Sequence, residues 1–214
     1  LKIENLYVKY GFIQALSNVS ILLNKGEIVL LDGHHGAGKS SLLNAIVGLV
    51  ASRGQVIIGK NIIKNRSPNK TLKLGVSFLP EGNCIFSNLT VKENIELGSV
   101  LASIKHSENA CDVFPEISHL LNKKAFFLSG GQSRMVAFAR SMASNPTYLL
   151  LDEPLSGLSK NPQEIIWKKL VELKNNGIGV LITGQHNVPE NSEIDHKYII
   201  ENGQIDKVFQ DILS

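Results

Sequence analysis

"GHHGAGKSS", residues 33–41, lies between an apolar run and a stretch with helical periodicity. It matches G-x-x-x-x-G-K-[ST], the pattern of a phosphate-binding loop (P-loop), without a mismatch. Such a loop follows a buried strand, opens a helix and turns its backbone N–H groups toward the phosphates of a nucleotide, and its glycines permit the close approach. The stretch therefore predicts a nucleotide site within an α/β fold.

The pattern assigns roles to the residues of the loop. Lys39 is expected to reach the β and γ phosphates of ATP, and the Ser40 hydroxyl is expected to ligate Mg²⁺. His34 and His35 are interpreted as solvent-facing side chains, because a loop of this kind binds phosphate mainly through its backbone. The residues predicted to surround the phosphates are Gly33, His34, His35, Gly36, Ala37, Gly38, Lys39, Ser40 and Ser41.

The bulk composition limits the class of protein. The chain has 214 residues, 43% hydrophobic and 19% charged, which is ordinary for one soluble domain with a sizeable core. The net charge of +3 is weak, and the basic residues are interpreted as scattered, so nucleic acid is not expected as a partner. Cys84 and Cys111 lack metal-ligand spacing and are expected to be reduced thiols in the cytosol.

The same composition speaks against direct membrane insertion. No uninterrupted apolar stretch reaches the roughly 18–20 residues that cross a bilayer. Lys2 and Glu4 interrupt the start of the chain, so we do not interpret it as a signal peptide. We expect a soluble protein that contacts a membrane only through a partner.

Apolar patterning predicts two kinds of strand. Residues 1–31 alternate apolar and polar positions, which predicts antiparallel strands and then a buried strand at residues 28–31. Residues 148–154 and 178–183 are continuous apolar runs, typical of parallel strands buried on both faces. Near the end, Asn202-Gly203 lies between two strand-like stretches and predicts a hairpin.

Helical patterning predicts a helix directly after the loop. Leu42, Ala45, Ile46 and Leu49 follow the spacing of one helix face, and Gly48 marks the end of the helix.

A second helical region begins at a capping box. Thr90 and Glu93 have the required spacing, and residues 83–128 look helical and polar between strand-rich flanks. We expect one domain spanning residues 1–214 with residues 83–128 as an inserted helical subdomain.

Two acidic residues follow the apolar run at residues 148–151. Asp152 and Glu153 would lie at the carboxyl edge of the sheet, where open α/β sheets place ligand chemistry. Asp152 is predicted to hold Mg²⁺ through water, and Glu153 to polarise the attacking water. A charge pair at a helix N-terminus is the alternative, and the presence of the P-loop favours the catalytic interpretation.

At residues 128–132, "LSGGQ" resembles the signature of ABC-type ATPases, and it stands about twenty residues before Asp152, as in that family. The order of P-loop, glutamine-loop region, signature, acidic strand end and switch region extends the resemblance over nearly the whole chain. It implies the ABC ATPase fold: a P-loop NTPase (RecA-like) α/β core, an antiparallel N-terminal β subdomain and an inserted α-helical subdomain.

The resemblance also implies a head-to-tail pair of ATPase domains, in which the signature of one chain closes over ATP held by the other. A helix opening at Ser129 offers a second anion site, because its first backbone N–H groups are free to face a phosphate. The signature residues concerned are Ser129, Gly130, Gly131 and Gln132. Tyr10 occupies the place of the family's adenine-stacking aromatic, although a lone tyrosine is more often packing material.

A closer resemblance links the chain to the ATPase subunits of branched-chain amino-acid importers. It rests on "PEGNCIFSNLTVKENIELG" at residues 80–98, "VFPEISHLL" at 113–121, "YGFIQAL" at 10–16 and "ENGQI" at 201–205. In that subfamily a glutamate replaces the usual loop glutamine, which assigns Glu81 to the nucleotide and Mg²⁺ site beside Ser40 and Asp152. A solvated turn residue is the alternative for Glu81.

Two positions depart from the general family pattern. Ser159 stands where the family generally has an aspartate that contacts the other subunit, an aspartate that the importer subfamily also lacks. In "LITGQHN", residues 181–187, the switch position falls on Gln185, and His186 follows it. Successive side chains of an extended segment point to opposite sides, so one of the two should face the nucleotide. We favour Gln185, and a bulge that shifts the register would select His186.

Together these features predict an ATP-binding and ATP-hydrolysing importer subunit for branched-chain or related amino acids, with ATP and Mg²⁺ as cofactors. The expected partners are transmembrane permease subunits, docked between the core and residues 83–128, and a second ATPase subunit. The expected location is the cytoplasmic face of the cell membrane. The rivals are a soluble ABC ATPase without a transport role and a nucleotide-binding regulatory subunit with weak hydrolysis.

Overall fold

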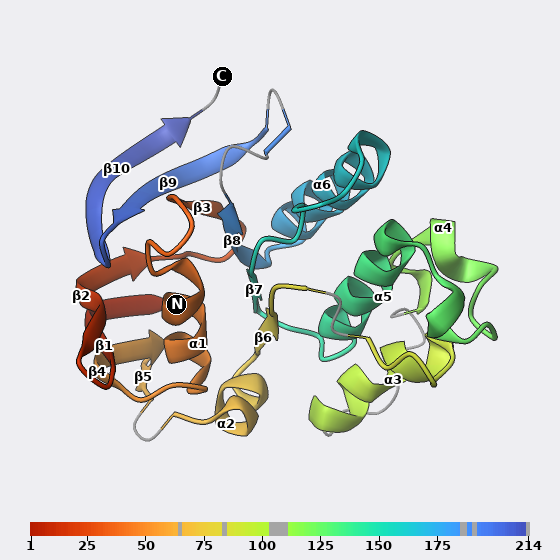
Figure 1. Cartoon of the computed structure of the whole chain (residues 1–214), viewed down its shortest axis with the longest axis horizontal. Coiled ribbons are helices and arrows are strands. Elements are labelled where there is room, and N and C mark those ends of the chain that lie inside the picture. The colour runs from red at the N-terminus through yellow and green to blue at the C-terminus, as the bar shows by residue number, and fades with distance from the viewer. Residues whose placement is uncertain (64–65, 83–84, 103–110, 185–187, 190–191, 213–214) are drawn as a thin grey trace.

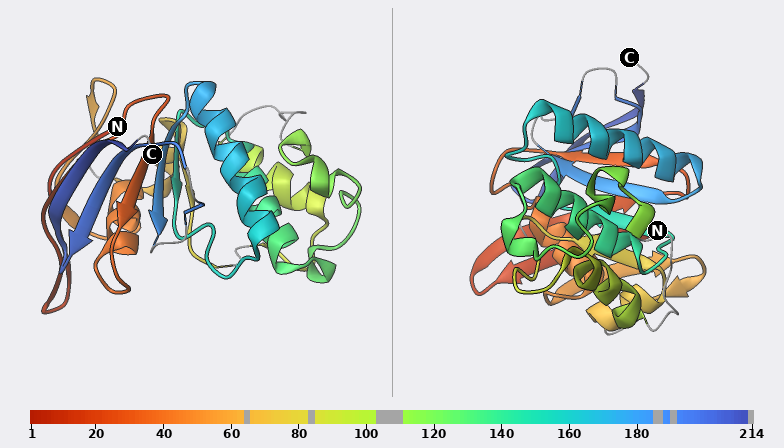
Figure 2. Two further views of the ribbon diagram at one scale, coloured as in Figure 1. Left: turned by 90° about the horizontal axis from the view of Figure 1, so that it is seen from above. Right: turned by 90° about the vertical axis from the view of Figure 1, so that its right-hand side faces the viewer.

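The structure is a computed structural model that describes residues 1–63, 66–82, 85–102, 111–184, 188–189 and 192–212. A strand-rich part contains both ends of the described chain, and a helical part lies beside it (Figure 1). The left view of Figure 2 shows the same two parts from above, with the helix that follows residue 38 lying between the two sheets of the strand-rich part.

The first sheet is antiparallel and has the strand order β2-β1-β4-β5. Its strands are β1 (Lys2–Tyr10), β2 (Ile13–Leu22), β4 (Ser52–Ile58) and β5 (Asn61–Ile62). The alternating pattern predicted β1 and β2 because every second side chain, such as Leu6 and Val8, is buried. We did not predict β4 and β5, which add the far edge of this sheet.

The second sheet forms the centre of the fold and has the order β10-β9-β3-β8-β7-β6. Its strands are β3 (Ile28–Asp32), β6 (Val76–Leu79), β7 (Tyr148–Leu151), β8 (Gly179–Gly184), β9 (Ile194–Glu201) and β10 (Gln204–Ile212). All neighbouring pairs are parallel except β9 and β10, which form the predicted hairpin around Asn202-Gly203. The continuous apolar runs are thus confirmed as buried parallel strands.

Register aligns the carboxyl ends of the central strands. Asp32 of β3 pairs with Gly184 of β8, and Leu151 of β7 pairs with Ile182 of β8. The residues that follow β3, β7 and β8 therefore emerge at one edge of the sheet. This edge is where open parallel sheets bind ligands.

Helices cover both faces of the central sheet. They are α1 (Lys39–Val47), α2 (Pro68–Lys73), α3 (Val91–Ala102), α4 (Pro115–Ser118), η2 (Ala125–Phe127), α5 (Gly130–Met142) and α6 (Lys160–Asn175). Helix α1 shares one hydrophobic core with both sheets, and α5 and α6 share another with the opposite face of the central sheet. Among the described residues, no helix is long and apolar enough to cross a membrane.

The predicted face of α1 is correct except for its last member. Leu42, Ala45 and Ile46 are buried, but Leu49 is 55% exposed. The cause is Gly48, which ends the helix in a left-handed conformation with φ 83° and turns the chain away before Leu49.

The region predicted as a helical insert, residues 83–128, contains α3, α4 and η2 in its described part. The capping box at its start is confirmed, because the Thr90 N–H and hydroxyl donate to Glu93 and the Glu93 N–H donates to the Thr90 hydroxyl. Phe114 packs edge-on against Phe138 of α5 at 5.3 Å between ring centroids. The independence of residues 83–128 as a subdomain stays a prediction.

Candidate functional site

The P-loop joins the carboxyl end of β3 to α1. Gly38 is the N-cap of α1 at φ 112°, and no side chain caps the first turn. A Cβ on Gly38 would lie 2.8 Å from a Leu16 methyl carbon and 2.9 Å from the Ala15 carbonyl oxygen. Glycine is thus required at position 38 for both conformation and space. The first N–H groups of α1 have no side-chain partner and face the same side as the positive end of the helix dipole.

A cavity of about 460 Å³ lies over this helix terminus. The predicted site residues that line it are His35, Gly36, Gly38, Lys39, Ser40, Ser41, Glu81 and Glu153. The fold thereby brings the P-loop together with the residues that follow β6 and β7. Gly33, His34, Ala37 and Asp152 lie at the loop or strand end without lining the cavity.

Two hairpins complete the walls of the cavity, and sequence reasoning did not assign them to it. Ile13, Gln14 and Ala15 come from the β1–β2 hairpin, and Asn202 and Gly203 come from the β9–β10 turn. The Gly203 N–H donates to the carbonyl of Ala37 at 2.9 Å, and the Ser17 N–H donates to the Gly203 carbonyl at 2.8 Å. The turn residues were visible in the sequence, but their contact with the P-loop was not.

Lys39 is held inside the loop. Its ammonium donates to the carbonyl oxygens of Gly33 at 2.6 Å and His34 at 3.1 Å. It also lies 3.3 Å from Glu153 Oε1, and its side chain is 4% exposed. Among the described residues that line the cavity, Lys39 is the one lysine or arginine. The expected phosphate-binding cation and the expected catalytic carboxylate therefore form an ion pair in this structure.

Thr183 links the two acidic residues that follow β7. Its hydroxyl donates to Asp152 Oδ1 at 2.7 Å and accepts the backbone N–H of Glu153 at 2.9 Å. Asp152 is buried, and Glu153 has a left-handed φ of 45°. We did not predict a role for Thr183. A polar residue at the end of the apolar run in β8 was the available signal.

Oxygen ligands suited to Mg²⁺ are present at the site. The Ser40 hydroxyl and the Glu81 carboxylate line the cavity, whereas Asp152 lies behind it with Oδ1 bonded to Thr183. Within the described residues, no three His, Cys, Asp or Glu side chains cluster closely enough to hold a metal ion alone. An Mg²⁺ ion held by the three predicted ligands would therefore also take oxygens from nucleotide phosphates and water.

The signature residues lie away from this cavity. Ser129 caps α5: its hydroxyl accepts the Gln132 N–H at 3.3 Å, and the Gln132 side chain accepts the Ser129 N–H at 3.0 Å. Gly130 is exposed, and α5 and α1 lie in different parts of the molecule (Figure 1). One chain thus does not bring its own signature to its own P-loop, as expected if the signature serves another copy.

An arginine that sequence reasoning missed connects the signature helix to the Glu81 segment. Arg134 of α5 is buried and donates to the carbonyl of Gly82 at 3.0 Å. The contact spans 52 residues of sequence, so no local pattern reveals it.

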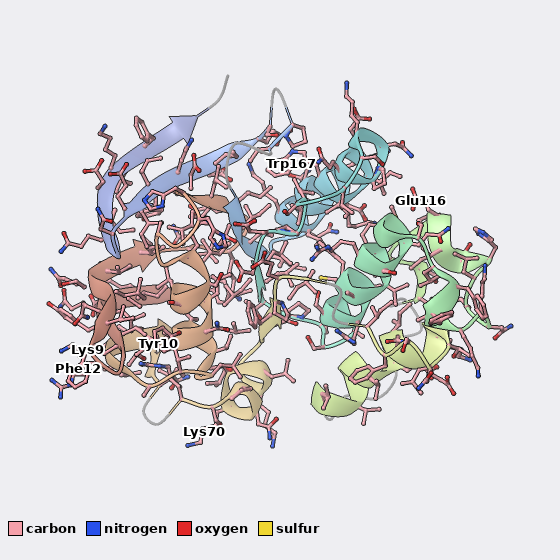
Figure 3. All side chains as sticks on the ribbon, viewed as in Figure 1. Lys9, Tyr10, Phe12, Lys70, Glu116 and Trp167 are labelled. Atoms are coloured by element: carbon pink, nitrogen blue, oxygen red, sulfur yellow. The ribbon has the colours of Figure 1, made fainter. Side chains whose placement is uncertain are left out.

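Tyr10 lies at the end of β1 beside the cavity. It pairs with Ile13 across the hairpin, and Ile13 lines the cavity while Tyr10 does not. Tyr10 is 45% exposed, and it lies near Phe12 and Lys9 in Figure 3. Its adenine-stacking role stays a prediction.

Two predicted positions cannot be compared with the structure. Gln185 and His186 lie outside the described residues, directly after Gly184, the last residue of β8. Ser159 is described: it is exposed, and it is the N-cap of α6 without a side-chain hydrogen bond to that helix. Cys84 also lies outside the described residues, and Cys111 is a free thiol whose pKa is raised by burial.

Comparisons with known proteins agree with this geometry. Residues 16–156 match the family model described as ABC transporter. The lipopolysaccharide export system ATP-binding protein LptB of Haemophilus influenzae is 37% identical over 96% of this chain and 88% of its own length. The high-affinity branched-chain amino acid transport ATP-binding protein BraG of Pseudomonas aeruginosa is 32% identical over 96% of this chain and 90% of its own.

Solved structures show the same fold. The ADP conformation of MJ1267, an ATP-binding cassette of an ABC transporter, has a TM-score of 0.87 and 31% identity, and the match covers 98% of this chain and 90% of that one. A dimeric post-hydrolysis state of the cassette MJ0796, bound to ADP and phosphate, has a TM-score of 0.82 and 26% identity over 98% of this chain and 97% of that one.

Proposed function

This chain belongs to the ABC transporter family and is an ATP-binding ATPase of that family, and from that premise we propose that it drives import of branched-chain or related amino acids. The observation that carries the proposal is Glu81. The importer-like segment that begins at Pro80 places this glutamate in the wall of the phosphate cavity, together with Lys39 and Glu153. The similarity to BraG supports the same substrate class.

The chain's own groups divide the work of hydrolysis. The N–H groups at the start of α1 and the Lys39 ammonium bind the β and γ phosphates. Glu153 accepts a proton from the attacking water while the oxygen of that water bonds to the γ-phosphorus. The bond from the γ-phosphorus to the bridging oxygen breaks, and ADP leaves with that oxygen. Ser40, Glu81 and Asp152, the last through water, would hold Mg²⁺, which neutralises phosphate charge when bound. Thr183 keeps Asp152 and Glu153 in their relative positions.

A second copy or a related subunit would supply the signature. Its Ser129 and the N–H groups of Gly130 and Gly131 would close over ATP from the side opposite α1. The dimeric state of MJ0796 supports this arrangement. Tyr10 would stack on the adenine at the rim.

Permease subunits would dock in an apolar groove between the core and the helical part. Leu49, Leu72 and Phe78 line it from the core side, and Leu101 and Arg140 line it from α3 and α5. Leu49 and Leu101 are more than half exposed, so the groove offers apolar surface to a partner. This contact would hold the protein at the cytoplasmic face of the membrane.

A second candidate is the ATPase subunit of a lipopolysaccharide exporter. LptB of Haemophilus influenzae is 37% identical to this chain, against 32% for BraG. Transport by purified components separates the two. The chain and its permease subunits are placed in proteoliposomes with ATP and a periplasmic-type binding protein, and uptake of labelled leucine, isoleucine and valine is measured.

The importer proposal predicts ATP-dependent uptake of at least one of these amino acids, lost with Glu153→Gln and retained with Glu164→Gln at an exposed position of α6. Absence of uptake together with ATP-dependent extraction of lipopolysaccharide would select the exporter. ATP turnover by the purified chain without any transported substrate would favour the ATPase without a transport role. Binding without turnover would favour a regulatory subunit.

The switch residue has its own test. Gln185 can donate to a phosphate oxygen and accept from water, so we expect Gln185→Ala to lower ATP turnover more than His186→Ala. Loss of turnover in the histidine variant alone would show that the register is shifted by one residue.

A further inference from the structure

A partly buried ion pair, with its carboxylate buried and its lysine 26% exposed, lies directly beside the P-loop. Asp32 is the last residue of β3 and precedes Gly33, and it is the one acidic residue between Glu27 and Glu81. Asp32 is 5% exposed, and its Oδ2 lies 2.7 Å from the ammonium of Lys197 in β9. No motif in the sequence predicted this pair.

Strand register explains how Lys197 reaches this position. In the parallel pair of β3 and β9, Lys197 lies opposite Leu30, and Asp32 lies opposite Ile199. The Lys197 side chain therefore extends along the sheet by two residues, toward the carboxyl edge. On its other side Asp32 pairs with Gly184, so this residue lies between β8 and β9 at the edge of the sheet that carries the P-loop.

Strand β9 also limits the space around Gly33, the first glycine of the P-loop. A Cβ on Gly33 would lie 2.4 Å from the carbonyl oxygen of Ile200 in β9. The carbonyl of Gly33 accepts the Lys39 ammonium. A series of neighbours thus runs from β9 to the phosphate site. Lys197 pairs with Asp32, Asp32 precedes Gly33 in the chain, and the Gly33 carbonyl accepts the Lys39 ammonium.

Stability alone gives little reason for this pair. Burying Asp32 and part of Lys197 costs hydration that offsets much of their attraction, and apolar residues of similar size would serve a sheet equally well. The consequence for nucleotide binding is larger. Without Lys197, Asp32 would add an uncompensated negative charge to a site that already contains Asp152 and Glu153 and must accept phosphates.

We propose that Lys197 is a positioning residue that neutralises Asp32 and so allows the P-loop to accept nucleotide phosphates. The inference rests on the nucleotide-binding role described above. It predicts opposite signs for the two single substitutions. Lys197→Met leaves the carboxylate unpaired and weakens MgADP binding, whereas Asp32→Asn removes a negative charge and strengthens it.

Titration calorimetry with MgADP tests this prediction without requiring dimerisation or turnover. We expect the dissociation constant to rise about tenfold for Lys197→Met, the order expected of one unit charge near the site. We expect it to fall by about twofold to threefold for Asp32→Asn. The double variant Asp32→Asn/Lys197→Met should return to within about threefold of the unmodified chain.

The chain offers a matched control on the same strand. Lys174 of α6 lies 2.9 Å from Asp195 of β9, and Asp195 accepts the backbone N–H of Ile28 at the opposite end of β3. Lys174→Met breaks a lysine–aspartate pair far along the strands from the P-loop. It should lower the melting temperature without changing MgADP affinity.

A merely structural role for the Asp32–Lys197 pair gives a different pattern. Both single variants would then lose affinity in parallel with melting temperature, and the double variant would not recover, which would overturn the proposal. If Lys197→Met does not fold, MgADP binding by Asp32→Asn and by Lys197→Arg still tests the proposal. Weaker binding by Asp32→Asn would overturn the proposal, and unchanged binding by Lys197→Arg with tighter binding by Asp32→Asn would support it.

The unmodified chain and Lys39→Ala separate this inference from the nucleotide-binding role itself. If the unmodified chain does not bind MgADP, the nucleotide-binding role fails. A different result would overturn only the inference about Lys197: the unmodified chain binds MgADP, Lys39→Ala weakens this binding, and Lys197→Met has the same MgADP affinity as the unmodified chain.

Discussion

Two helices, α1 and α5, begin at glycine-rich segments predicted to face phosphates, but their first turns are completed differently. Helix α1 begins after Gly38, and no side chain caps it. Helix α5 begins after Ser129, whose hydroxyl and backbone form a reciprocal capping box with Gln132. The α1 terminus leaves its first backbone N–H groups available to a ligand, whereas the α5 terminus hydrogen-bonds the Gln132 N–H with the Ser129 side chain of the same chain.

The difference matches two kinds of site. Helix α1 is stabilised by packing, because Leu42, Leu43 and Ile46 are fully buried. The helix can therefore form without a cap, and its first N–H groups stay available for a nucleotide. The α5 terminus is exposed and would meet phosphate only when a second chain arrives. A cap keeps that helix intact in the absence of a ligand.

The largest expected effect leaves both helix termini unchanged and removes the predicted catalytic base in the cavity at the α1 terminus. Glu153→Gln should reduce ATP turnover by about 10²–10⁴-fold, because the amide cannot take the proton from water. It should preserve or tighten MgADP binding, since Lys39 is released from the ion pair. Phosphate release and calorimetry measure the two quantities. Glu164→Gln is the control, and normal turnover in Glu153→Gln would move the base elsewhere.

The next effect concerns the α1 terminus alone. Lys39→Ala removes charge-assisted hydrogen bonds worth about 1.5–3 kcal/mol, so MgADP affinity should fall about tenfold to a hundredfold. Calorimetry measures the loss, and Lys160→Ala, at an exposed position of α6, should bind normally. Unchanged affinity in Lys39→Ala would contradict the assignment of the P-loop.

A smaller effect concerns the α5 terminus. Ser129→Ala removes the cap and should cost about 1 kcal/mol of folding free energy. It should also lower ATP turnover while leaving MgADP binding by one chain unchanged. Thr90→Ala is the matched control, because it removes the same hydroxyl from the capping box of α3. Equal turnover in the two variants would place Ser129 outside the reaction.

The smallest effect separates the two capping boxes by charge. In α3 the pKa of Glu93 is lowered, first by the hydrogen bond from the Thr90 backbone N–H and then by its hydroxyl, whereas α5 uses the neutral Gln132. A carboxylate whose pKa is lowered in the folded state stabilises the fold at pH values above its pKa in the unfolded chain. That contribution is lost as the pH falls through the folded-state pKa.

Melting temperatures of the unmodified chain and Glu93→Gln should therefore differ at neutral pH and converge in acid. The difference should be small, because Glu93 is exposed to solvent. A gap that stays constant down to the most acidic pH at which the chain folds would show that the charge of Glu93 has no role.

Local patterns predicted β3, β7, β8, the β9–β10 hairpin, α1 and the capping box, because each depends on residues close in sequence. Leu49 was misplaced since one glycine ended the helix before it. Residues 52–62 were not recognised as β4 and β5, although they return to pair beside β1.

The missing parts of the site were long-range pairs. Thr183 meets Asp152 across two strands, and Lys197 meets Asp32 across another pair. Neither contact follows a sequence period, because parallel strands are joined through distant crossovers.

The hydrogen bond from Gly203 to Ala37 has a consequence for how the protein is made. During synthesis the P-loop leaves the ribosome first, and the turn that closes the wall of its cavity follows more than 160 residues later. Strand β3 also remains without both of its neighbours for a long stretch of synthesis, because β8 and β9 lie far after it in the chain. A bound nucleotide therefore cannot stabilise the nascent chain through this complete site until the β9–β10 turn has been translated.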